Sequence, residues 1–368
     1  MFSRACVLLL LAPSAHAAEP SLQLTLPPMW YGVPGVPVSL YYDNVVLTEK
    51  PESYEFEVKC DIGTSEARRW TVTPAGKDAG DHPMQVTVKD NHGKVVEQGK
   101  TVLHIAPTNA GEGRELKMLI VGDSLTAATA YPNEIARLLS EPGNPKWTML
   151  SDHKPATAHP GVDHEGYGGW TWAAFLSRWV EKPKDADKKN DSSPFMYKDA
   201  SGKPGLDIPR YFREHCGGQT PDVVTFLLGI NDCFHVKAED DQAVDKVIDT
   251  ALDNATKLLT AFHSAVPKAV FAVGLTTPPN SRESGFEANY HGQYHRWGWK
   301  QIQHRLVRRM MERFGDGKMP RVYLVPTEIN LDPVDGYPDN NGVHPNNTGY
   351  AQIGTSFYAW LKSWMAGK

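Results

Sequence analysis

Continuous apolar runs alternate with helical segments along residues 115–368. The runs LKMLIVG, VVTFLLG, AVFAVG and RVYLV lack polar alternation, and amphipathic segments at 127–143, 241–267, 301–315 and 349–366 separate or follow them. A strand that is apolar on both faces has to be covered on both faces, which is typical of a parallel sheet between helices. The pattern therefore predicts an α/β unit with a covered parallel sheet.

Residues 21–105 have a different pattern. Short β-branched and aromatic stretches such as YEFEVKC and MQVTVKD are separated by Gly, Pro and Asn-Asp turn residues, and no helical period is present. This pattern predicts a small all-β sandwich. The polar, glycine-containing segment 106–115 resembles a linker, so we expect a β-sandwich with linker over 18–112 and a second domain over 113–368.

The first 17 residues resemble a secretory signal peptide. Arg4 supplies a positive charge, an apolar centre follows at 7–12, and Ala15-His16-Ala17 forms a small-residue cleavage site. Cleavage after Ala17 predicts a secreted or periplasmic protein. No other stretch approaches about 18 apolar residues, so we expect no membrane span.

Charge and cysteine content narrow the function classes. The net charge is −5, both signs are dispersed and no long basic run occurs, which argues against a nucleic-acid partner. The cysteines after the signal, Cys60, Cys216 and Cys233, form no CxxC motif and are expected to be free thiols. The histidine-containing segments at 153–164 and 291–295 match no strong metal-binding spacing, so neither a metal nor another cofactor is expected.

Polar residues follow several of the apolar runs. Ser124 comes after the first run and Asn231 after the second, at the strand ends where α/β sheets bind ligands. Taken alone, Ser124 is equally well explained as a helix N-cap. Acyl transfer, however, needs a nucleophile, a base and donors for the developing oxyanion. Ser124, His344, a glycine N–H and the Asn231 amide supply these groups.

Four motifs resemble those of the SGNH hydrolase superfamily, the GDSL esterases, over about 115–368. They are GDSL at Ser124, GYGGWT at Gly169, GIND at Asn231 and VHPNNTGY at His344. The resemblance implies a flavodoxin-like three-layer α/β/α sandwich with a parallel sheet. It also implies Ser124 as nucleophile, His344 as base, and an oxyanion hole made by Ser124 N–H, Gly169 N–H and Asn231 Nδ2.

One position departs from the family pattern. The family usually carries Asp three residues before the histidine, where this chain has Asn341. Asp339 lies two residues further back and is the carboxylate proposed here to orient the imidazole. Asn341 or a backbone carbonyl is the alternative, because an amide can also orient a catalytic histidine.

The substrate is expected to be an acetylated polysaccharide or oligosaccharide. A signal peptide, an appended β-sandwich and an aromatic, cationic insertion at 280–299 favour a carbohydrate ester. Trp170, Tyr294 and Arg296 are the candidate substrate contacts. A secreted lipase or arylesterase acting on small acyl esters is the alternative. A glycan-binding protein without activity is a further alternative, which the presence of Ser124, Asn231 and His344 argues against.

Overall fold

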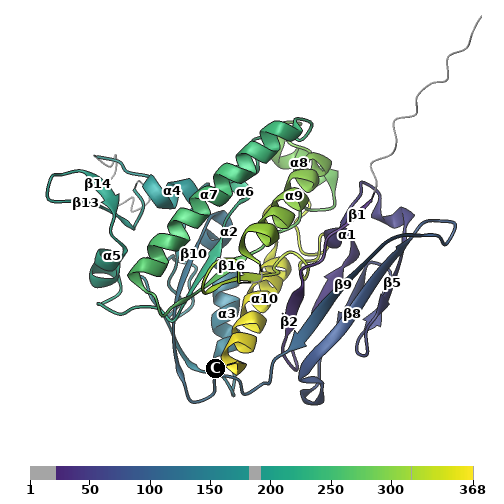
Figure 1. The fold of residues 1–368 in the computed structure, drawn as a ribbon, viewed down its shortest axis with the longest axis horizontal. Helices are drawn as coiled ribbons and strands as arrows, with labels where there is room; N and C mark the ends of the chain where they lie inside the picture. Colours follow the sequence, from purple (N-terminus) through teal and green to yellow (C-terminus); the bar gives the residue numbers. More distant parts are fainter. Residues whose placement is uncertain (1–21, 182–191, 316, 368) are drawn as a thin grey trace, which may run out of the picture.

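The computed structural model of the chain describes residues 22–181, 192–315 and 317–367 and shows a helix-rich unit beside a β-rich one (Figure 1). The signal peptide predicted at 1–17 lies outside the described residues. Within the described ranges, no helix is long and apolar enough to cross a membrane.

Five parallel strands form the central sheet, in the order β11-β10-β15-β16-β17. They are β10 (Glu115–Gly122), β11 (Lys146–Met149), β15 (Val223–Leu227), β16 (Val270–Gly274) and β17 (Val322–Val325). The short β12 (Glu165–Gly166) pairs with the end of β10. This order is the flavodoxin-like one, with its switch point between β10 and β15. The predicted fold class is therefore confirmed.

Helices flank this sheet in two groups. The helix α3 (Ala130–Leu139) packs against α10 (Asn347–Ala366), whereas α7 (Asp241–Ala265) packs against α4 (Trp172–Ser177), α5 (Ile208–His215) and α9 (Arg296–Phe314). Every residue of β15 and β16 is buried, because both faces of these strands are covered. Shorter elements are α2 (Ser124–Ala127), α6 (Ile230–Cys233), α8 (Glu283–Tyr290) and the hairpin of β13 (Met196–Lys198) and β14 (Pro204–Leu206).

Two antiparallel-rich sheets form the N-terminal unit. One contains β2 (Met29–Gly32), β9 (Val95–Ile105), β8 (Gly80–Lys89) and β5 (Glu55–Lys59); the other contains β3 (Val38–Tyr41), β7 (Arg69–Val72) and β6 (Thr64–Ser65). A separate pair joins β1 (Gln23–Leu24) to β4 (Val46–Leu47), and short 3₁₀ turns lie at Pro51–Ser53 and Gly76–Asp78. Trp30 and Trp70 meet edge to face, 6.0 Å apart, in the core of this unit.

The segment that follows β17 joins the two units. Ile329 is fully buried in the core of the β-sandwich, and its carbonyl accepts a hydrogen bond from Tyr41 N–H. Asn44 Nδ2 donates to the carbonyls of Glu328 (2.8 Å) and Leu331 (2.7 Å). The β-branched and aromatic run PVSLYYDNVVLT around Asn44 is typical of one extended strand. It instead contains a helical turn, α1 (Tyr42–Val45), from which Asn44 makes these contacts.

Candidate active site

Ser124 is the first residue of α2, immediately beyond the turn that ends β10. Asp123 caps this helix, since its carboxylate accepts a hydrogen bond from Leu125 N–H at 3.0 Å. Glycine is required at position 122, because a Cβ there would lie 1.9 Å from Thr126 Oγ1. The tight turn presents the Ser124 hydroxyl at the carboxyl end of the strand, and the helix cap is supplied by Asp123 rather than by Ser124.

His344 contacts the Ser124 hydroxyl directly. Its Nε2 lies 2.9 Å from Ser124 Oγ, and its Nδ1 lies 3.2 Å from Asn341 Oδ1. The same Asn341 oxygen accepts hydrogen bonds from the backbone N–H groups of Val343 (3.1 Å) and His344 (2.9 Å). Because a backbone N–H can only donate, this atom is the amide oxygen. In the neutral imidazole, Nδ1 therefore carries the proton and the Nε2 lone pair faces Ser124.

Asp339, the carboxylate selected from the sequence, does not approach this imidazole. Its side chain is 90% exposed and lies 3.5 Å from the guanidinium of Arg282. Asn341 occupies the position beside Nδ1 instead, as in the alternative drawn from the sequence. Consistent with the absence of a charged partner, the pKa of His344 is lowered, and burial is the cause.

Asn280 holds the loop that carries these two residues. Its side chain is fully buried, and its Nδ2 donates to the carbonyls of Pro338 (2.9 Å) and Asn341 (3.0 Å). Its backbone N–H donates to Gly342 O at 2.9 Å. These bonds fix the backbone on both sides of Asp339. No role was assigned to Asn280 from the sequence.

The residues proposed for the oxyanion hole lie on two neighbouring turns. Gly169 has φ +76°, a conformation that favours glycine, and a Cβ there would meet no atom within 4 Å. Asn231, on α6, donates one Nδ2 hydrogen to Trp170 O at 3.0 Å. An amide nitrogen has two hydrogens, so the second is available to a ligand. This bond ties α6 to the glycine turn.

Glu165 supports the glycine turn from beneath, a role that sequence reasoning missed. Its carboxylate is 1% exposed and accepts hydrogen bonds from Ser151 Oγ (2.6 Å), Tyr211 Oη (2.7 Å) and Tyr167 Oη. Three hydroxyl donors thereby compensate the burial of a charge. The sequence feature that could have indicated this role is the position of Glu165 directly before the GYGG run.

Two buried carboxyl groups lie behind the nucleophile. Burial, opposed by the hydrogen bond from Leu125 N–H and aided by the nearby Asp232, raises the pKa of Asp123 to about 7. Burial likewise raises the pKa of Asp232 to about 7, opposed by its hydrogen bond from Trp172 N–H. Neither carboxyl group contacts His344 in the described structure, so we assign them to the support of the α2 and α6 turns.

The three predicted substrate contacts lie in different surroundings. Trp170 is only 2% exposed, and its ring packs between Tyr167 and Phe175, 4.6 and 4.8 Å away. It therefore offers no open platform, because the turn that exposes Gly169 directs the indole into the core. Tyr294 lines a pocket of about 460 Å³, where its hydroxyl lies 2.6 Å from His235 Nδ1. Arg296 lines a separate pocket at the β-sandwich.

No group of three or more His, Cys, Asp or Glu side chains in the described ranges is arranged to hold a metal ion. Cys60, Cys216 and Cys233 are free thiols. The chemistry available at the site is that of the Ser124 hydroxyl, the His344 base and the surrounding N–H donors.

Comparison with solved structures gave matches among carbohydrate esterases. A family 3 carbohydrate esterase from Talaromyces cellulolyticus is 18% identical, with a TM-score of 0.40 over 69% of this chain and 99% of that one. The family 3 carbohydrate esterase of Clostridium thermocellum is also 18% identical, with a TM-score of 0.39 over 69% of this chain and 98% of that one. A family 2 carbohydrate esterase with a carbohydrate-binding domain, from Corynascus thermopiles (Myceliophthora fergusii), is 15% identical, with a TM-score of 0.39 over 95% of this chain and all of that one.

Comparison with curated proteins gave no match. The model of the GDSL-like Lipase/Acylhydrolase family, in contrast, matches residues 120–352, which is more than half of the chain and contains Ser124, Gly169, Asn231 and His344. The chain is thus an ester hydrolase that belongs to the GDSL-like lipase/acylhydrolase family, within the SGNH hydrolases.

Proposed function

We propose that this protein is a secreted serine esterase that removes O-acetyl groups from carbohydrate. The observation that carries the catalytic part is the 2.9 Å contact between Ser124 Oγ and His344 Nε2, with the opposite ring nitrogen held by Asn341. A serine hydroxyl is a weak nucleophile until a base takes its proton, and this geometry provides that base.

In the first half-reaction, His344 Nε2 takes the Ser124 proton while Oγ attacks the ester carbonyl carbon. The negative charge on the former carbonyl oxygen is received by the N–H groups of Ser124 and Gly169 and by Asn231 Nδ2. The intermediate collapses as Nε2 returns the proton to the departing sugar oxygen, and an acetyl-Ser124 ester remains.

In the second half-reaction, His344 Nε2 takes a proton from water, which attacks the acetyl carbonyl carbon. Collapse of that intermediate returns the proton to Ser124 Oγ and releases acetate. Throughout both steps, Asn341 orients the imidazole through its dipole and adds no charge to stabilise the imidazolium.

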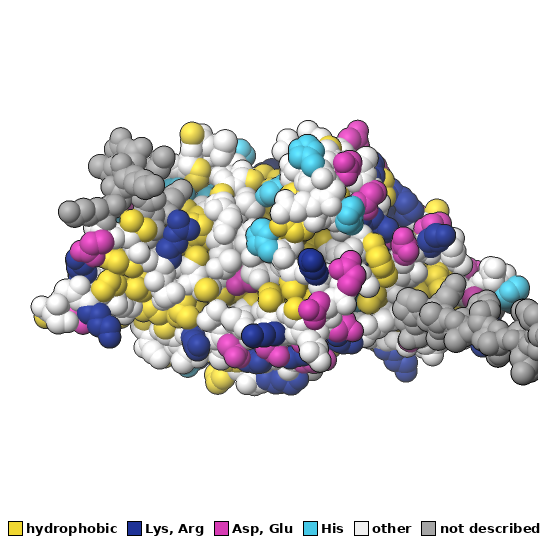
Figure 2. Space-filling model, turned by 90° about the horizontal axis from the view of Figure 1, so that it is seen from above, with side chains coloured by type: hydrophobic (Ala, Val, Ile, Leu, Met, Phe, Trp, Pro, Cys, Tyr) yellow, Lys and Arg dark blue, Asp and Glu magenta, His cyan; other side chains and the backbone are white. Residues whose placement is uncertain are grey.

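Hydrogen-bonding side chains among the aromatic residues of the pocket at Tyr294 support a carbohydrate substrate. Figure 2 shows hydrophobic, acidic, basic and histidine side chains interspersed on the face that includes α8. The pocket at Tyr294 has a mixed wall, in which His235, Gln293 and His295 lie beside apolar residues that include Phe234, Trp297 and Trp299. Sugar hydroxyls need hydrogen-bonding partners of this kind, whereas a long acyl chain needs an apolar tunnel.

Acetate release should be measured across a panel of acetylated polysaccharides, together with hydrolysis of p-nitrophenyl esters of increasing chain length. The proposal predicts release from at least one polysaccharide and a steep fall in activity from acetyl to butyryl esters. Activity that rises toward octanoyl esters, without release from any polysaccharide, would identify a lipase instead.

A further inference from the structure

A second pocket of about 480 Å³ lies where the β-sandwich meets the hydrolase unit, and we call it the interdomain pocket. The β-sandwich contributes Tyr42, Glu49, Glu52 and Tyr54 to its wall, and the hydrolase unit contributes Ser281 and Arg296. Its volume is in the range of ligand-binding pockets, roughly 300–1,000 Å³. Neither unit forms this pocket alone.

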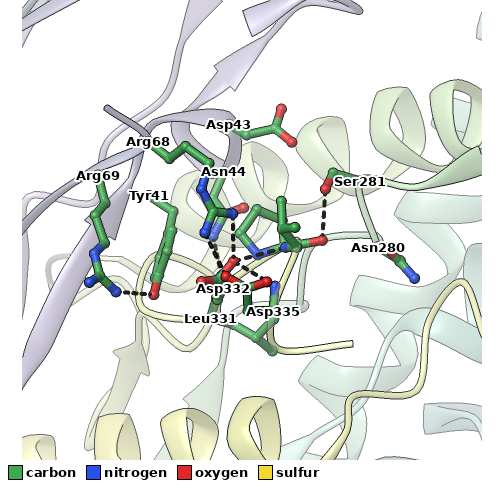
Figure 3. A network of polar contacts seen from close by, with 12 residues as sticks. Tyr41, Asp43, Asn44, Arg68, Arg69, Asn280, Ser281, Leu331, Asp332 and Asp335 are labelled. Atoms are coloured by element: carbon green, nitrogen blue, oxygen red, sulfur yellow. Dashed lines mark hydrogen bonds and ion pairs between the residues drawn. The ribbon is translucent and has the colours of Figure 1, made fainter. Parts of the chain in front are cut away.

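Three charged groups in its wall, Asp43, Arg68 and Arg296, are already paired. Asp43 forms ion pairs with Lys300, which is only 2% exposed, and with Arg296 at 3.4 Å. Arg68 reaches from the β-sandwich to Asp332 (3.3 Å) and Asp335 (2.7 Å), as Figure 3 shows. Because both arginines of the wall are paired with carboxylates, the wall does not favour a phosphate.

The remaining wall groups suit a sugar. Tyr42 stacks on Phe56 with ring centroids 4.6 Å apart and planes within 4°, and Tyr54 lies beside them as a half-buried ring. Tyr42 itself is only 4% exposed and supports Phe56, so the half-buried rings of Phe56 and Tyr54 are the ones that can contact the C–H face of a sugar. The exposed carboxylates of Glu49 and Glu52 can accept hydrogen bonds from its hydroxyls. The guanidinium of Arg68, which is half exposed, can donate to a hydroxyl or ring oxygen.

The wall of this pocket is continuous with the loop that carries the catalytic histidine. Ser281 Oγ donates to Pro333 O at 2.9 Å on the pocket side (Figure 3). The preceding residue, Asn280, donates to Asn341 O, and Asn341 contacts His344. A chain seated in the pocket would thus lie against the segment that leads to the ester-cleaving residues.

We propose that the interdomain pocket is a subsite for a neutral sugar unit of the same polysaccharide whose ester Ser124 cleaves, an inference that rests on the function proposed above. The subsite holds the chain at a distance from the reacting ester. It therefore contributes to the binding of polymers and not to that of small acetyl esters.

The test compares kcat/KM for acetylated xylan and acetylated glucomannan with kcat/KM for p-nitrophenyl acetate in the full chain. For Tyr54→Ala, the ratio of polymer to small-ester activity is expected to fall about ten-fold on the preferred polymer, which corresponds to about 1.4 kcal/mol. Tyr54→Phe keeps the ring and should retain most of the ratio. Glu52→Gln should also lower the ratio, and because Glu52 is exposed this change does not disturb the core. Glu55→Gln is the control: Glu55 is an exposed acid outside the pocket, and its replacement should leave the ratio unchanged.

A titration with xylohexaose and mannohexaose, which carry no ester, provides a readout independent of catalysis. The wild type should bind one of them, and Tyr54→Ala should bind it at least several-fold more weakly. In one outcome, the wild type is active on polymers while Tyr54→Ala and Glu52→Gln show unchanged activity ratios and unchanged oligosaccharide binding. This result would overturn the subsite and leave the esterase proposal intact. A wild type that releases no acetate from any polysaccharide would overturn the proposed function first, and the subsite with it.

Discussion

Asn341 Oδ1 lies 3.2 Å from Nδ1 of His344 and accepts two backbone N–H groups of the same loop. An amide therefore occupies the position in which a carboxylate would stabilise the imidazolium. Because an amide and not a carboxylate lies beside Nδ1, burial is the effect that shifts the pKa of the His344 imidazole. Burial lowers this pKa.

Asn341→Asp should move the acid limb of the pH–kcat/KM profile to higher pH by about one unit. A carboxylate beside Nδ1 favours the protonated imidazole, so a higher pH is needed to obtain the neutral base. The profile is measured on p-nitrophenyl acetate, with Asn340→Asp as the neighbouring control. An acid limb at the wild-type pH in Asn341→Asp would show that position 341 does not face the titrating base.

Asp339→Asn should retain near-wild-type kcat, because this side chain is exposed and paired with Arg282. Asn341→Ala should lower kcat by about 10²-fold, less than the roughly 10⁴-fold loss when the carboxylate of a complete triad is replaced by an amide. Both values are measured at mildly alkaline pH on one small acetyl ester. The reverse order of the two losses would return the orienting role to Asp339.

Asn231→Ala should lower kcat by about 10²–10³-fold while KM changes little, since its free amide hydrogen is proposed to contact an oxyanion that forms only near the transition state. Because Asn231 also donates to Trp170 O, thermal unfolding of the variant must be measured alongside. A rise in KM with kcat unchanged would make Asn231 a ground-state binding residue.

Glu328 should make the stability of the fold fall as pH rises. Burial raises the pKa of its carboxyl from about 4.5 to about 8. Between these values the unfolded chain has released this proton and the folded chain retains it, so the contribution is complete below about pH 4.5 and is lost as pH rises through about 8. In urea unfolding between pH 5 and 9, Glu328→Gln should make the fall in stability shallower, with Asp123 and Asp232 accounting for the remainder. Glu112→Gln, at an exposed position, should leave the wild-type dependence unchanged. Parallel curves for wild type and Glu328→Gln would contradict the assignment.

The sequence predicts the sheet well because its long apolar strands have few alternatives. The strands β10, β15, β16 and β17 all appear where uninterrupted apolar runs stand, and Ser124 and Asn231 follow two of them. The edge strand β11 was missed, since only one of its four residues KWTM is buried and they form no such run. Residue type and spacing thus indicate buried strands more clearly than exposed edges.

The third position was misassigned because charge was given more weight than spacing: the family spacing points to Asn341, which contacts His344, whereas the carboxylate of Asp339 does not. A loop can direct either of two residues to the imidazole, and here Asn280 decides between them by holding Pro338 O and Asn341 O. The contact between the two units could not be predicted either. No local sequence pattern indicates that Ile329 packs in the core of the β-sandwich, which lies more than 200 positions earlier in the chain. Both features depend on contacts between segments distant in sequence.

The central claim is that Ser124 forms the acyl-enzyme with His344 as its base. Turnover of p-nitrophenyl acetate by Ser124→Ala tests it most directly, with circular dichroism to verify the fold. Because nucleophile and base act as a unit, the account predicts a loss of about 10³-fold or more in kcat/KM. Wild-type turnover by a correctly folded Ser124→Ala protein would contradict it.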